Sequence, residues 1–135
     1  MSNPLVPNWL TKVSEFDDPA WPEGAQRNDS GELELGGVSC TELVRKYGSP
    51  LYVIDQLEFE NRLVRVRKAF EGAAQLAGTS VKLYYASKAL LTADVARWAA
   101  NAGYAIDVST GGELAIVLAA GLPGCLLYTS DAADE

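Results

Sequence analysis

One lysine stands out for its chemistry, because it follows an apolar stretch with the composition of a buried strand. Lys88 lies within VKLYYASKALL, residues 81–91. An amine at the rim of an apolar strand loses hydration, which favours its neutral form, and a neutral amine can attack an aldehyde to form a Schiff base. Pyridoxal phosphate is the usual cofactor of this kind. A solvated surface lysine is the commoner arrangement, so the surroundings of Lys88 must decide.

A polar turn follows the next apolar stretch. Asp107 ends that stretch, and DVSTGGE, residues 107–113, leads into an expected helix. The turn could accept an anion on helix N-terminal amides, or its carboxylate could orient a neighbouring amine. Alternatively, Ser109 or Thr110 caps the helix and Glu113 favours its positive end. The stretch matches neither the GxGxxG pattern nor the Walker pattern, so the turn alone does not identify a site.

Strands and helices alternate from residue 51 onward, with short connections. Apolar stretches predict strands at 51–54, 81–86 and 104–108, and amphipathic stretches predict helices at 56–74, 91–102 and 113–120. This alternation predicts parallel strands covered by helices, in either an open doubly wound sheet or a barrel. Both architectures carry their sites at the carboxyl ends of the strands. Lys88 and Asp107 should therefore emerge at the same face.

The chain before residue 51 has a different character. Residues 1–32 hold four of the six prolines among polar and acidic residues, which predicts an irregular leader. Residues 31–39 alternate acidic and apolar side chains like a short exposed strand, and residues 40–48 fit a helical turn that Gly48 stops. We expect a domain over residues 33–124.

Composition excludes several classes of partner. Eighteen acidic residues against 11 basic ones give a net charge of -7, which disfavours binding to nucleic acid. No apolar run approaches the roughly 20 residues that cross a bilayer, and the N-terminus lacks a signal-peptide pattern, so a cytoplasmic protein without membrane contact is expected. The two cysteines, Cys40 and Cys125, are far apart, and the chain has no histidine. Neither a metal site nor a disulfide framework is indicated.

Three motifs occur in order: GSPLYV at 48–53, YASKA at 85–89 and DVSTGGEL at 107–114. Together they resemble the N-terminal part of diaminopimelate decarboxylases, over about residues 20–124. These are pyridoxal-phosphate enzymes with an alanine-racemase-like barrel, related to ornithine and arginine decarboxylases. The resemblance implies an α/β fold: a truncated (β/α)₈ TIM-like barrel of about three βα units, preceded by the irregular N-terminal segment.

The same resemblance implies roles for individual residues. Lys88 would be the Schiff-base lysine that binds pyridoxal 5'-phosphate, Asp107 would lie beside it, and Glu113 would occupy a position that is often acidic in related decarboxylases. The implied reaction is loss of carbon dioxide from meso-diaminopimelate to give L-lysine, in a parent enzyme that is a homodimer. Another basic amino-acid decarboxylase of this fold, a non-catalytic pyridoxal-phosphate carrier and an unstable fragment remain as alternatives.

The end of the chain departs from this pattern. Residues 125–135, CLLYTSDAADE, stand where the family resemblance leads us to expect a further strand, and they resemble a translated sequencing adapter. We expect a non-native tail there, with a genuine acidic tail as the alternative. A complete (β/α)₈ barrel takes about 250 residues. The 135-residue chain is therefore expected to be an inactive fragment of its parent.

Overall fold

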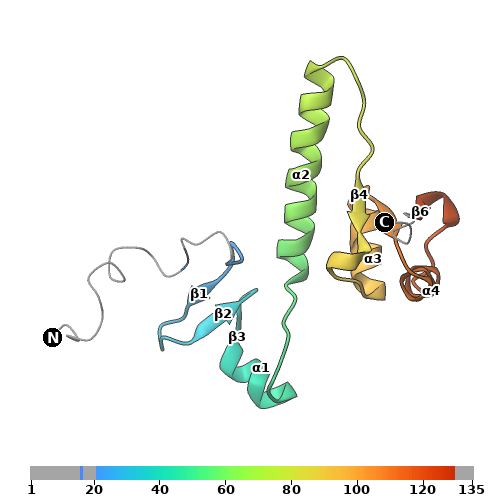
Figure 1. Ribbon diagram of the computed structural model, residues 1–135. Coiled ribbons are helices and arrows are strands. Elements are labelled where there is room, and N and C mark those ends of the chain that lie inside the picture. Colours follow the sequence, from blue (N-terminus) through green and yellow to red (C-terminus); the bar gives the residue numbers. More distant parts are fainter. Residues whose placement is uncertain (1–15, 17–20, 130–135) are drawn as a thin grey trace, which may run out of the picture. The chain divides into compact units, whose positions relative to one another are not determined.

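The computed structural model describes residue 16 and residues 21–129 (Figure 1). The chain divides into two compact units, Met1–Glu58 and Phe59–Glu135. The first unit contains β1 (Gln26–Arg27), β2 (Leu33–Leu35), β3 (Val38–Ser39) and α1 (Cys40–Tyr47). Helix α2 (Gln56–Leu76) begins at the end of the first unit. The second unit continues with β4 (Tyr84–Ala86), the 3₁₀ turn η1 (Ser87–Ala89), α3 (Ala93–Asn101), β5 (Ala105–Val108), α4 (Gly111–Ala119), the 3₁₀ turn η2 (Gly124–Leu126) and β6 (Leu127–Thr129).

The first unit is a small antiparallel sheet followed by a helix. Its strands have the order β1-β2-β3, and Gly36, with a φ of 57°, lies in the turn between β2 and β3. Ser39 caps α1 by accepting a hydrogen bond from the Thr41 amide at 3.1 Å. Gly48 ends α1 with a φ of 86°, as its position in the sequence predicted. Strand β1 lies within residues 1–32, which were expected to be irregular; residues 1–15 and 17–20 of that segment lie outside the described part.

The sequence predicted the first strand of the alternating region at residues 51–54, and this prediction is wrong. Residues 51–54 belong to neither sheet, and their side chains are exposed. An apolar stretch becomes a strand only where another strand pairs with its backbone, and no described strand pairs with this one. The following helix was predicted correctly: α2 begins at Gln56, and Asp55 Oδ1 accepts a hydrogen bond from the Glu58 amide at 3.1 Å.

The second unit contains a parallel sheet, in agreement with the predicted fold class. Its strands have the order β4-β5-β6, and both pairings are parallel. Ile106 and Val108 of β5 are buried in the core. Helix α3, its C-cap residue and α4 complete the core with small and branched side chains: Ala96, Ala99, Ala102 and Val117. Helices α3 and α4 cover one face of this parallel sheet, as predicted from the alternation of strands and helices.

Two adjacent tyrosines show the two faces of this sheet. Tyr85 packs edge-on against Phe59 of α2, with ring centroids 5.6 Å apart. Tyr84 packs instead against Tyr128 of β6, at 5.4 Å. Because successive strand residues point to opposite faces, Tyr84 lies on the face away from the helices. Both side chains therefore have packing roles.

Strand β6 lies inside the segment expected to be a non-native tail. Residues 127–129 pair in parallel with residues 106–108 of β5, where the family pattern calls for a further strand. The edge of β5 offers unpaired backbone groups, and an extended apolar stretch can satisfy them. The origin of residues 125–135 stays a prediction, and residues 130–135 lie outside the described part.

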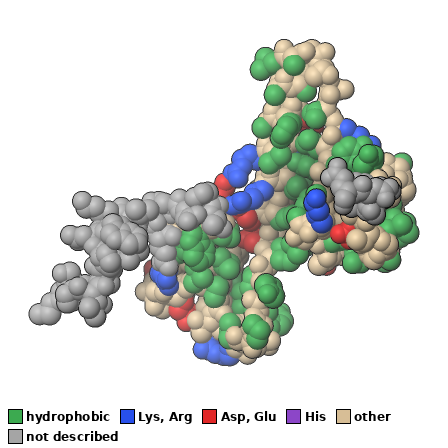
Figure 2. Space-filling view, viewed as in Figure 1, with side chains coloured by type: hydrophobic (Ala, Val, Ile, Leu, Met, Phe, Trp, Pro, Cys, Tyr) green, Lys and Arg blue, Asp and Glu red, His purple; other side chains and the backbone are tan. Residues whose placement is uncertain are grey.

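Apolar side chains remain on the surface of α2. Figure 2 shows hydrophobic groups along this helix, and Leu57, Phe70 and Leu76 are exposed. Across the described residues, no helix combines the length and the apolar composition needed to cross a membrane.

Candidate functional site

The parallel pairing of β4 and β5 determines where the two predicted site residues lie. Ala86 and Asp107 are register partners on these neighbouring strands. Lys88 follows Ala86 by two residues, in the η1 turn directly after β4. The carboxyl ends of parallel strands meet at one edge of the sheet, so Lys88 and Asp107 emerge at the same edge. The structure thus brings together the two turns that the sequence singled out.

The carboxylate of Asp107 has a hydrogen-bond acceptor that is unsatisfied among the described residues. Its side chain is half-buried, and its Oδ1 atom is inaccessible to solvent and accepts no hydrogen bond from the described residues. A buried carboxylate oxygen without a donor is unfavourable, and such atoms are rare in native proteins. By alternation Asp107 points to the same face as Tyr84, away from the helices. An incoming group with an N–H or O–H donor would satisfy this oxygen.

Lys88 differs from the sequence prediction in one respect. The prediction assumed an amine that burial deprives of water, whereas the Lys88 side chain is exposed. The η1 turn carries it beyond the end of β4, and the three strands of the second unit do not enclose it. The loss of hydration predicted for Lys88 is therefore wrong for this structure, and the feature that remains is that Lys88 emerges at the same sheet edge as Asp107.

The DVSTGGE turn adopts the capping arrangement that the sequence left open. Thr110 Oγ1 accepts a hydrogen bond from the Glu113 amide at 3.2 Å, and Glu113 Oε2 accepts one from the Thr110 amide at 3.1 Å. The Ser109 amide also donates to Glu113 Oε2, at 2.7 Å. This bond from Ser109 is the main reason that the pKa of Glu113 lies below its usual value. Glu113 therefore stabilises the start of α4.

One residue near the site, Ser87, was not among the candidates predicted from the sequence. Ser87, directly before Lys88, is 2% exposed, and its Oγ atom makes no hydrogen bond of ordinary geometry with the described residues. A period-2 reading of residues 83–87 places Ser87 on the helix-facing side of the strand with Tyr85. That periodicity was the signal available for its burial.

The sequence matches the family model described as "Pyridoxal-dependent decarboxylase, pyridoxal binding domain" over residues 58–132. This match covers more than half of the 135 residues and includes both Lys88 and Asp107. The chain belongs to the pyridoxal-dependent decarboxylases. Membership in this family implies pyridoxal 5'-phosphate as the cofactor, as the sequence predicted.

Curated relatives and solved structures agree with this assignment to the pyridoxal-dependent decarboxylases. The chain is 39% identical to diaminopimelate decarboxylase of Mycobacterium tuberculosis, over 76% of the chain and 22% of the relative. It is 41% identical to diaminopimelate decarboxylase of Bacillus subtilis, over 73% of the chain and 22% of the relative. The crystal structure of diaminopimelate decarboxylase from M. jannaschi superposes with a TM-score of 0.72 at 28% identity, covering 81% of this chain and 25% of that one. The chain thus spans less than a quarter of the curated relatives' length in these alignments.

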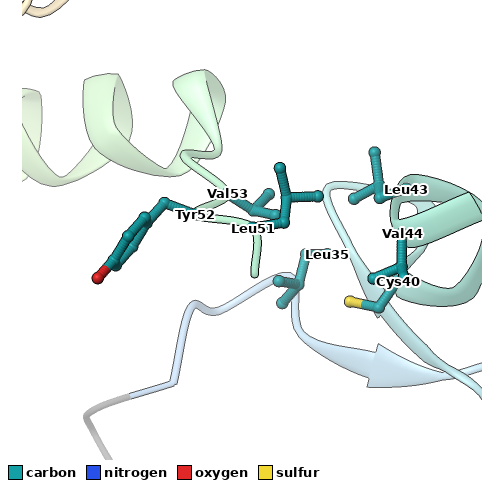
Figure 3. A pocket seen from close by; sticks show the side chains of 7 residues that line it. All are labelled: Leu35, Cys40, Leu43, Val44, Leu51, Tyr52 and Val53. Atoms are coloured by element: carbon teal, nitrogen blue, oxygen red, sulfur yellow. The ribbon is translucent and has the colours of Figure 1, made fainter. Parts of the chain in front are cut away.

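The first unit contains an apolar pocket (Figure 3). It has a volume of about 280 Å³, and it is lined by Leu35, Cys40, Leu43, Val44, Leu51, Tyr52 and Val53. The ring of Tyr52 points away from the other labelled side chains in Figure 3. Within the described residues, no cluster of histidine, cysteine and carboxylate side chains could hold a metal ion. The pocket lacks the lysine and carboxylate chemistry that the second unit provides.

Proposed function

We propose that the chain is the N-terminal portion of a diaminopimelate decarboxylase in which Lys88 holds pyridoxal 5'-phosphate and Asp107 lies beside the cofactor. The observation that carries this proposal is the register pairing of Ala86 with Asp107, which brings the lysine turn and the carboxylate to one sheet edge. Family membership supports the cofactor, and the names of the curated relatives support the substrate.

The residues at this edge fit such a cofactor. Lys88 supplies an exposed amine that can bond to an aldehyde carbon, and the unpaired Asp107 Oδ1 can accept a hydrogen bond from a bound N–H or O–H group. When bound, pyridoxal phosphate would supply an electron sink for the pair of electrons left as carbon dioxide departs. The contribution of Lys88 is attachment and proton transfer at Nζ. The contribution of Asp107 is orientation through its buried oxygen.

Substrate identity and activity of the isolated chain form the finer part of the proposal. We assign meso-diaminopimelate as the substrate of the parent enzyme and L-lysine and carbon dioxide as its products. Another basic amino acid would be the substrate if the parent proved to be an ornithine or arginine decarboxylase. The 135 residues by themselves are proposed to be inactive, since three parallel strands provide only part of a barrel wall. The parent is proposed to be a homodimer.

Covalent labelling of the chain tests the role of Lys88. The protein is incubated with pyridoxal 5'-phosphate, reduced with borohydride and digested, and the labelled peptides are quantified. We expect the label to concentrate on Lys88, with much less on the other lysines that the structure describes: Lys46, Lys68 and Lys82. The variant K88R should lose this label while keeping the positive charge. Equal labelling of all four lysines would refute a preformed site.

A second experiment tests the substrate in a protein extended through the rest of its reading frame. Release of carbon dioxide is compared for meso-diaminopimelate, ornithine and arginine. We expect activity with meso-diaminopimelate, and K88A should reduce its rate by at least a thousandfold, because attachment and proton transfer both depend on the amine. Undiminished activity in K88A would refute the role assigned to Lys88. Preference for ornithine or arginine would refute the substrate and leave Lys88 unaffected.

A further inference from the structure

Ser87 places a buried hydroxyl directly beside the proposed cofactor lysine. The residue is 2% exposed, its Oγ is closed off from solvent, and it makes no hydrogen bond of ordinary geometry with the described residues. Alanine would fill a buried apolar position without leaving a polar atom unpaired. The buried hydroxyl of Ser87, unlike an alanine side chain, therefore requires a hydrogen-bond acceptor.

The nearest candidate is the carboxylate of Glu113. Its Oε2 atom already accepts hydrogen bonds from the Ser109 and Thr110 amides, at 2.7 and 3.1 Å. A carboxylate can accept about four hydrogen bonds, so capacity remains for a further donor. The Ser109 amide contributes most to the lowered pKa of Glu113, and the Ser87 hydroxyl contributes in the same direction. The η1 turn contacts β5, and Glu113 Oε2 binds the amides of the two residues that directly follow β5, so the hydroxyl and the carboxylate belong to turns that lie close together.

We infer that Ser87 donates a hydrogen bond from Oγ to the Glu113 carboxylate, and that this bond positions the η1 turn and therefore Lys88. A change of the Ser87 χ1 rotamer can bring Oγ to an acceptor without movement of the backbone. Glu113 is itself held at the start of α4 by the Ser109 and Thr110 amides. The lysine turn after β4 is thereby tied to the turn after β5, the strand that contains Asp107. Ser87 and Glu113 are positioning residues, and their role rests on the function proposed for Lys88.

The test compares three serine variants by the labelling experiment. S87A removes the hydroxyl, S87T keeps a hydroxyl, and S80A is the matched control at an exposed serine. We expect S87A to lower the share of label on Lys88 at least fivefold relative to the wild-type chain. S87T and S80A should stay within twofold of the wild type. An unchanged share in S87A, or an equal loss in S87T and S87A, would overturn the inference.

A second measurement does not depend on the cofactor. The carboxyl group of Glu113 is titrated by ¹³C NMR in the wild-type chain and in S87A. Loss of one hydrogen bond to the carboxylate should raise the Glu113 pKa by roughly half a pH unit in S87A. Identical titration curves would overturn the tie between Ser87 and Glu113. Failure of Lys88 labelling in the wild-type chain, together with a raised Glu113 pKa in S87A, would refute the proposed function and leave the tie intact.

Discussion

The hydroxyl of Tyr104 donates a hydrogen bond of 2.9 Å to the backbone carbonyl of Leu63, 41 residues earlier in the chain. Tyr104 is only 5% exposed, and the bond joins the residue before β5 to the middle of α2. Burial raises the pKa of the Tyr104 hydroxyl, so the group stays protonated as a donor at neutral pH.

Replacement of Tyr104 by phenylalanine removes this bond and keeps the ring. We expect Y104F to lower the free energy of unfolding by about 1 kcal/mol, the usual net contribution of one hydrogen bond. The same substitution at Tyr52, which is 98% exposed, is the control and should have little effect. Equal stability of Y104F and Y52F in urea unfolding would show that the bond contributes nothing.

Gly36 is expected to tolerate alanine less well than its neighbour Gly37. Both have positive φ angles, 57° and 76°, so each substitution should cost about 1 kcal/mol in backbone strain. A Cβ at Gly36 would lie 2.9 Å from Oδ2 of Asp55, whereas a Cβ at Gly37 meets nothing within 4 Å. The loss of stability in G36A beyond that in G37A should disappear when both substitutions are made in a chain that carries D55A. Amide hydrogen exchange of β2 and β3 measures the local stability, and indistinguishable exchange in G36A and G37A would contradict the prediction.

Acid should destabilise the start of α4 through Glu113. The Ser109 amide lowers the Glu113 pKa below its ordinary value of 4.5 in the folded protein. A carboxyl with a lowered pKa contributes stability above its unfolded pKa and loses that contribution as the pH falls through the folded pKa. The melting temperature of E113Q should therefore fall less steeply below pH 4.5 than that of the wild-type chain. E42Q, at an exposed position of α1, is the control, and parallel profiles for E113Q and the wild type would refute the prediction.

Ile106 should be the most sensitive position in β5. Its side chain is fully buried in the core, and truncation to alanine leaves a cavity that costs about 2–5 kcal/mol. Ile54, at 43% exposure, provides the comparison, and I54A should cost less than about 1 kcal/mol. Thermal unfolding followed by circular dichroism distinguishes the two variants. A loss in I54A as large as that in I106A would contradict the prediction.

Local signals predicted much of the fold correctly. Thr110 caps α4 and Gly48 stops α1, and each of these interactions involves a few neighbouring residues that the sequence displays. The prediction of a strand at residues 51–54 was wrong because it depended on a distant part of the chain. Strand formation requires a hydrogen-bonding partner from elsewhere in the chain, and apolar composition does not reveal whether that partner is present.

In the candidate site, too, some features could be predicted from the sequence and others depended on the tertiary structure. The sequence identified Lys88 and Asp107 through their positions after apolar stretches and through the family resemblance. It predicted the wrong hydration for Lys88, because exposure depends on what the rest of the structure covers. It also passed over Ser87, although the alternation of residues 83–87 placed Ser87 on the same face as Tyr85, which packs against α2.

The sequence by itself determined the alternation of strands and helices, the helix caps and the family, because these depend on residue types at short or characteristic spacings. Only the tertiary structure decided that Ala86 pairs with Asp107, that Asp107 Oδ1 is buried without a donor and that residues 127–129 complete the parallel sheet. The physical reason is that strand register and burial are set by groups far apart in the chain. Each takes its value only when the folded backbone brings those groups together.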